Sequence, residues 1–269
     1  MSAIDKPLAI ECGVPAALPC RPWGFWVSLA WFAVALTVLL WAFARLEHAL
    51  LNGTAFGKLI GSSLALGALN LLLGWAVPLL ILLAAVRIRR CPVRDYFGWL
   101  RPRGRDVLLA IVLALAVQFA YYAFFYLTGE DMTAGAIAQY RLETAAGTPH
   151  WSATLLGWPA IVCAPFVEES MFRGFLWRGW EHSPLGAAGA WLLTSLVFAG
   201  YHIPVAIGMQ PALATMMLVQ VFLLGLVLGW VRWRGGNTTA TIIGHVAHNL
   251  VPPLYTFAVG AMFGGIAHP

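Results

Sequence analysis

The feature that most constrains the fold is a series of long apolar stretches without Asp, Glu, Lys or Arg. Six such stretches lie between residue 22 and residue 269. A helix of about 20 apolar residues crosses the hydrocarbon core of a bilayer, and each stretch reaches that length. The fifth, 183–231, is long enough for two helices, with a turn between Pro204 and Pro211, because proline disrupts a helix. The pattern predicts an all-α, polytopic integral membrane protein.

Seven transmembrane helices follow from these stretches. They are predicted at 24–44, 60–86, 107–128, 152–178, 184–203, 211–231 and 238–260. As an alternative, a break at Pro252-Pro253 leaves residues 254–266 as an eighth, short helix. Residues 1–21 form a cytosolic N-terminal tail, and 22–269 form a single transmembrane domain. Charged residues make up only 10% of the chain, against about 25% in soluble domains, so an ordinary soluble enzyme is excluded.

The distribution of positive charge predicts the orientation in the membrane. With the N-terminus in the cytosol, 13 of the 16 Lys and Arg residues lie on the cytosolic side, and only Arg45, Lys58 and Arg141 lie outside. The segment Arg87–Arg105 then forms a cytosolic loop that contacts anionic lipid head groups. Aromatic and basic residues do not alternate as in nucleic-acid-binding proteins, so no nucleic acid partner is expected. A bacterial plasma (inner) membrane is the expected location.

The four cysteines show no pattern of a metal site or a redox motif. They are Cys12, Cys20, Cys91 and Cys163, with no C-x-x-C spacing and no nearby zinc-type histidines. We therefore expect small buried or interfacial thiols.

Charged side chains at the end of an apolar run are the first candidates for chemistry. Glu168 and Glu169 directly follow the apolar run 155–167. Glu169 and Arg173 are four residues apart, so they lie on one helix face and can form an ion pair. Glu168 projects elsewhere and has no such cation, so it is the carboxylate available for proton transfer. The alternative is a helix end at which all three side chains are solvated.

Histidines in two later helices are the second group of candidates. His202 follows Phe198 by four residues near the end of the fifth span, and His245 precedes Asn249 by four. His248 lies beside them and is not assigned a role. Polar groups in a membrane helix rarely face lipid. The competing explanations are structural. His202 is then a hydrogen-bonded residue at a helix end, and His245, His248 and Asn249 only form hydrogen bonds between helices.

These residues together resemble the three motifs of a known family. Glu168-Glu169-x-x-x-Arg173, Phe198-x-x-x-His202 and His245-x-x-x-Asn249 occur in this order on successive apolar helices. This arrangement is similar to the CPBP family, the type II CAAX prenyl endopeptidases and their bacterial relatives, also called Abi proteins. The resemblance covers about residues 105–260, with the motifs within 165–250. It implies an intramembrane endopeptidase in which Glu168 and His202 activate water, while His245 and Asn249 stabilise the oxyanion.

The sequence therefore predicts a membrane-embedded peptidase of the glutamic type that needs no cofactor. Glu169 and Arg173 hold the geometry of the site. One alternative is a zinc-dependent peptidase with Glu168, His202 and His245 as ligands. Another is a transporter or a non-catalytic scaffold that uses the same buried groups. The expected partners are the lipid bilayer and a membrane-embedded or lipid-modified peptide or protein substrate, whose prenylation the sequence does not specify.

Overall fold

The computed structural model describes residues 20–55, 58, 64–129, 159–207 and 209–263. In these residues all regular structure is helical, which confirms the all-α class. The long helices are α1 (Phe25–Leu51), α3 (Leu64–Ile88), α5 (Gly104–Thr128), α10 (Gly186–Tyr201), α12 (Pro211–Gly235) and α13 (Thr238–Phe263). Short helices are α4 (Val93–Phe97) and α11 (Ile203–Ala206).

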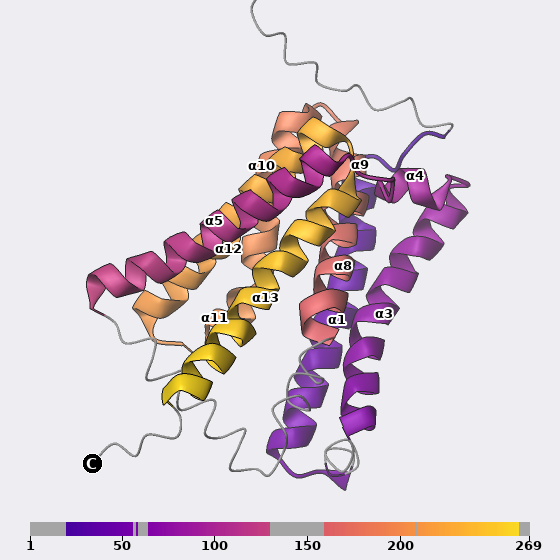
Figure 1. The fold of residues 1–269 in the computed structure, drawn as a ribbon. Helices are drawn as coiled ribbons and strands as arrows, with labels where there is room; N and C mark the ends of the chain where they lie inside the picture. The colour runs from indigo at the N-terminus through magenta and orange to yellow at the C-terminus, as the bar shows by residue number, and fades with distance from the viewer. Residues whose placement is uncertain (1–19, 56–57, 59–63, 130–158, 208, 264–269) are drawn as a thin grey trace, which may run out of the picture.

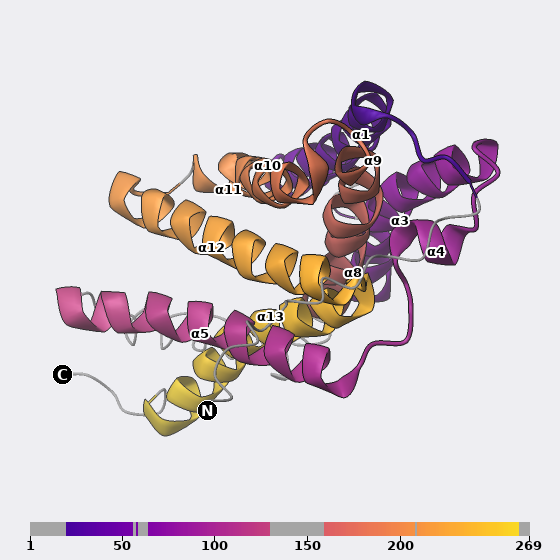
Figure 2. The same ribbon diagram turned by 90° about the horizontal axis from the view of Figure 1, so that it is seen from above.

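One continuous helical segment, residues 159–181, runs through the middle of the molecule. It consists of the π-helical η1 (Pro159–Cys163), α8 (Ala164–Glu169), the π-helical η2 (Ser170–Leu176) and α9 (Trp177–Glu181). Figures 1 and 2 show α1 and α3 on one side of this segment and α5, α12 and α13 on the other. The segment contacts α1, α3, α10 and α13. We call it the central segment.

Four helices are long and apolar enough to cross a bilayer. They are Phe25–Leu46, Gly104–Thr128, Gly186–Ala206 and Pro211–Gly235, and α3 contains a shorter apolar helix, Leu72–Ile88. The chain is an integral membrane protein, but the predicted count of seven or eight spans is not confirmed. The central segment and α13 are not among these four. The central segment carries the charged motif and α13 carries the motif His245-x-x-x-Asn249, whereas Phe198 and His202 lie within Gly186–Ala206.

Two expectations are corrected by the structure. Helix α13 continues through Pro252 and Pro253 to Phe263, so the chain does not break there. Proline is tolerated in membrane helices because neighbouring groups satisfy the freed carbonyls. Cys20 and Cys91 form a disulfide, so the expectation of thiols is wrong for these two residues, whereas Cys163 is free. The loop expected around Glu130 and most of the N-terminal tail lie outside the described residues.

Candidate active site

The site is built on the central segment, where every residue from Val167 to Trp180 is buried. A helix that is buried all round belongs in the interior of a membrane bundle, where a charged side chain needs a partner inside the protein. The carbonyl of Arg173 lies within the π-helical η2 and is reached by side chains of other elements. This carbonyl accepts hydrogen bonds from Arg232 Nε at 3.0 Å and Thr238 Oγ1 at 3.4 Å.

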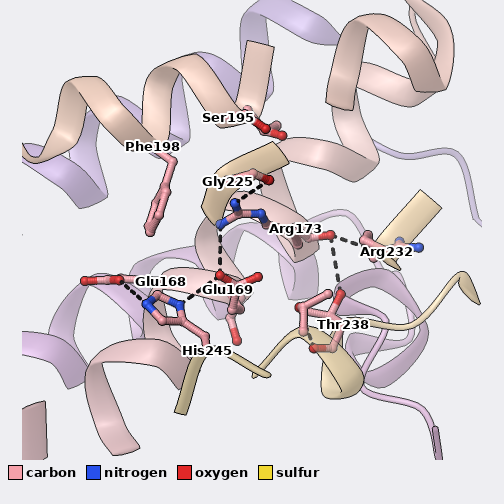
Figure 3. Close-up of polar contacts among 12 residues, drawn as sticks. Glu168, Glu169, Arg173, Ser195, Phe198, Gly225, Arg232, Thr238 and His245 are labelled. Atoms are coloured by element: carbon pink, nitrogen blue, oxygen red, sulfur yellow. Dashed lines mark hydrogen bonds and ion pairs between the residues drawn. The ribbon is translucent and has the colours of Figure 1, made fainter. Parts of the chain in front are cut away.

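Glu169 forms the centre of a buried charged cluster. Its Oε1 lies 2.9 Å from Arg173 Nη1, and both side chains are fully buried. This is the ion pair that the four-residue spacing predicts. The same oxygen also lies 3.0 Å from His245 Nδ1, a contact between the central segment and α13 (Figure 3). Glu169 therefore holds two partners, whereas the sequence indicated only Arg173.

Arg173 also connects the site to α12. Its Nη2 donates a hydrogen bond to the Gly225 carbonyl at 3.0 Å, and its guanidinium lies 4.5 Å from the centre of the Phe198 ring. A Cβ atom on Gly225 would lie 3.1 Å from Ser195 Cβ and 3.4 Å from Arg173 Nη2. Glycine at this position therefore allows the backbone of α12 to approach both α10 and the guanidinium.

Glu168 has a different environment from its neighbour. It is 7% exposed, and its Oε2 lies 3.8 Å from His245 Nε2, on the opposite side of the imidazole from Glu169 (Figure 3). The hydroxyl of Tyr201 also interacts with the Glu168 carboxylate. Within the described part of the chain, His245 and Tyr201 orient this carboxylate, and no arginine contacts it directly.

Phe198 connects the two motif histidines. Its ring centre lies 4.9 Å from that of His202 and 5.7 Å from that of His245, and both contacts are edge-to-face. His202 Nδ1 lies 2.9 Å from the Phe198 carbonyl oxygen, which can only accept a hydrogen bond. Nδ1 of His202 therefore carries a proton, and in the neutral ring Nε2 is a hydrogen-bond acceptor.

The predicted site residues come together to different degrees. Glu168, Glu169, Arg173 and His245 are in direct contact. His202 adjoins them through Phe198 and Tyr201, and Asn249 lies one helical turn beyond His245 on the same face of α13. Sequence reasoning missed Tyr201, although it directly precedes a motif histidine. It also missed Gln118 and Gln220, which contact His248 or each other; glutamine inside an apolar helix is the signal that indicates them.

The residues of the zinc alternative do not form a ligand sphere in this conformation. In the part of the chain that the structure describes, no three His, Cys, Asp or Glu side chains gather closely enough to hold a metal ion. His245 instead uses both ring nitrogens toward carboxylates, with Nδ1 at hydrogen-bonding distance from Glu169. These side chains therefore do not fit zinc as they stand.

The fold and site define an all-helical integral membrane protein with a buried cluster of carboxylates, histidine and arginine. Residues 150–251 match the family model described as type II CAAX prenyl endopeptidase Rce1-like, and this confirms the resemblance carried by the three motifs. All six predicted site residues lie inside the matched segment. The match supports a CAAX-type intramembrane endopeptidase. No curated protein and no solved structure shows significant similarity to the chain.

Proposed function

We propose that this protein is an intramembrane endopeptidase in which Glu168 activates a water molecule. The observation that carries this proposal is the difference between two adjacent glutamates. The charge of Glu169 is neutralised by Arg173 at 2.9 Å, whereas Glu168 is almost completely buried and contacts no arginine among the residues that the structure describes. A carboxylate in such an environment is suited to accept and return a proton.

The reaction then follows general base catalysis. Glu168 removes one proton from water while the water oxygen attacks the peptide carbonyl carbon, and His202 Nε2 accepts a hydrogen bond from the O–H that remains on this oxygen. The tetrahedral intermediate collapses as its carbon–nitrogen bond breaks. Glu168 returns the proton to the leaving amine, which restores the carboxylate.

His245 and Asn249 stabilise the oxyanion in this scheme. Because Nδ1 of His245 faces the Glu169 carboxylate at 3.0 Å, that nitrogen must carry a proton. Nε2 of His245 is on the other side of the ring, 3.8 Å from Glu168 Oε2, next to the carboxylate that we propose as the base. Preorganised donors in a site without bulk water give strong stabilisation of developing negative charge, and each is worth about 2.7–4 kcal/mol in other hydrolases.

The experiment that tests this function compares native membranes containing the wild-type protein with membranes containing Glu168→Gln. Mass spectrometry of membrane proteins should reveal new C-termini that appear only with the wild-type protein. Glu169 remains in place in this variant, so we expect the buried ion pair and the fold to be retained. Identical sets of C-termini in the two membranes would contradict the proposal and favour a transporter or a scaffold.

Chelation separates the glutamic mechanism from the zinc alternative. We expect strong chelators to leave the Glu168-dependent cleavage unchanged, because the described His and carboxylate side chains do not gather into a ligand sphere. Loss of cleavage on chelation and its recovery with zinc alone would assign Glu168, His202 and His245 as ligands. The substrate we propose is a membrane-embedded or lipid-modified peptide or protein, by extension from the matched family.

A further inference from the structure

His248 is a buried histidine that the proposed mechanism does not use. It lies on α13, is 8% exposed, and its two ring nitrogens face different partners. Nδ1 lies 3.1 Å from Asn249 Oδ1, and Nε2 lies 3.3 Å from Gln220 Nε2 on α12. His248 thus connects a proposed oxyanion donor to a neighbouring helix.

The connection continues across the membrane domain to α5. Gln220 Nε2 also donates a hydrogen bond to Gln118 Oε1 at 2.8 Å, and Gln118 is only 2% exposed. Tyr122, one turn along α5, interacts with Gln118 in turn. Four neutral polar side chains, Gln118, Gln220, His248 and Asn249, therefore form a chain across three helices. We call this set the amide chain. Gln118 lies outside the segment that matches the family model.

The direction of the hydrogen bonds follows from the chemistry of the atoms. An amide nitrogen of glutamine donates and does not accept, so Nε2 of His248 must be the unprotonated nitrogen. The proton of the neutral ring is then on Nδ1, which donates to Asn249 Oδ1. Among the described residues, the side chain of Asn249 has no other hydrogen-bond partner. Its carbonyl oxygen is therefore occupied, and its NH₂ group remains available.

We propose that His248 is a positioning residue that fixes the amide of Asn249 so that Nδ2, and not Oδ1, faces the reacting carbonyl. The proposal rests on the oxyanion role proposed for Asn249. An asparagine amide rotated by half a turn presents an acceptor where a donor is needed, and it would repel the oxyanion. The Nδ1 proton of His248 selects the productive rotamer before substrate binds. Gln220 and Gln118 in turn select the tautomer of His248.

The tautomer of His248 can be measured without any substrate. Nitrogen NMR of the detergent-solubilised protein with isotope-labelled histidine distinguishes protonated from unprotonated ring nitrogens, and the His248 signals are those lost in His248→Gln. We expect a protonated Nδ1 and an unprotonated Nε2. In Gln220→Leu the His248 signals should shift toward the tautomer with the proton on Nε2. Thr215→Val, which removes a hydroxyl at the exposed start of α12, should not change them. A wild-type His248 with the proton on Nε2 would overturn the proposal, because Asn249 Nδ2 would then be its donor.

Cleavage rates test whether His248 acts through Asn249. The rate measured is the appearance of those C-termini that require Glu168. Asn249→Ala should lower this rate by about 10²- to 10³-fold, because the oxyanion loses a hydrogen-bond donor. His248→Ala should lower it by up to about 10²-fold, because the Asn249 amide is then no longer held in the orientation that the oxyanion needs. In the double variant, loss of His248 should add nothing to the loss of Asn249. Multiplicative losses would show that His248 acts independently and would contradict the proposal.

The two measurements also separate this inference from the proposed function. If no C-terminus depends on Glu168, the proposed function fails. The NMR result still determines the direction of the hydrogen bonds in the amide chain. If cleavage depends on Glu168 but the proton lies on Nε2 of His248, only the positioning role fails.

Discussion

The central segment and the amide chain bury polar groups in the same membrane domain in two different ways. The central segment is enclosed on all sides from Val167 to Trp180, and it contains full charges that are paired at short distances. Helices α5, α12 and α13 expose apolar side chains such as Leu108, Val112 and Phe257 along much of their surface, and the amide chain lies in the seam between them. Charges inside a membrane domain need countercharges within the protein, whereas neutral polar side chains need only hydrogen bonds to one another. We therefore expect proton transfer in the central segment, whereas the amide chain orients a side chain of the site.

The largest effect is expected for the carboxylate that we assign as the base. Glu168→Gln keeps the shape of the side chain but cannot accept a proton, so cleavage should fall by about 10²- to 10⁴-fold or more. The melting temperature in detergent should stay close to that of the wild type, because Glu169 still pairs with Arg173. Glu168→Asp retains the charge and should retain part of the activity. If Glu168→Gln unfolds the protein while Glu169→Gln is stable and inactive, our assignment of the two glutamates is reversed.

A loss of stability is expected for the partner glutamate. Glu169→Gln leaves Arg173 buried without a countercharge and weakens the contact with His245. Removing one member of a buried ion pair typically costs about 3–5 kcal/mol. The melting temperature should therefore fall, with partial activity in the folded fraction. Arg173→Gln should behave similarly, and the double variant should be less than additive.

A matched control for this loss of stability lies outside the site. Glu181 pairs with Arg178 at 2.6 Å, also within one helical turn. Glu181→Gln should lower the melting temperature without changing cleavage by the folded protein. Equal effects of Glu181→Gln and Glu169→Gln on cleavage would mean that Glu169 has no particular connection to the site.

The positions of the helices were predictable from the sequence. A helix must be long enough to cross the bilayer, and the charged residues that flank each apolar stretch mark its ends. The predicted span 211–231 corresponds to α12, Pro211–Gly235, and the predicted span 107–128 to α5, Gly104–Thr128. The ion pair between Glu169 and Arg173 was predictable because it is local. The second partner of Glu169, His245, lies 76 residues away, and only tertiary packing reveals such a contact. The disulfide was missed for the same reason, since 71 residues separate Cys20 from Cys91.

A smaller change in stability is expected where α13 touches α5. A Cβ atom on Gly244 would lie 2.8 Å from the backbone carbon and oxygen of Ala110, so Gly244→Ala must push these helices apart. Overpacking of this kind typically costs about 1–3 kcal/mol. Gly200 on α10 is the control, because nothing lies within 4 Å of its Cβ position, and Gly200→Ala should be neutral or slightly stabilising. Melting temperatures measure both. Equal melting temperatures would show that α5 and α13 are not packed this closely.

The last prediction concerns the orientation of the two regions in the membrane, and its test does not require a measurement of cleavage. Two features of the sequence and structure predict opposite orientations. The distribution of Lys and Arg places the Arg87–Arg105 loop in the cytosol, whereas the disulfide between Cys20 and Cys91 in that neighbourhood is of a kind that is rare in the cytosol. We expect the charges to decide, since 13 of 16 agree.

Single cysteines in a background without the four native ones measure this orientation. A membrane-impermeant thiol reagent applied to whole cells should modify a cysteine at Thr133, outside the described residues, and spare one at Gly104. Gly104 has open space around its Cβ position, so the side chain is tolerated there and its protection reports only the side of the membrane. The opposite labelling pattern would place the disulfide in an oxidising compartment. It would also place the end of the central segment that carries Arg178 outside the cell.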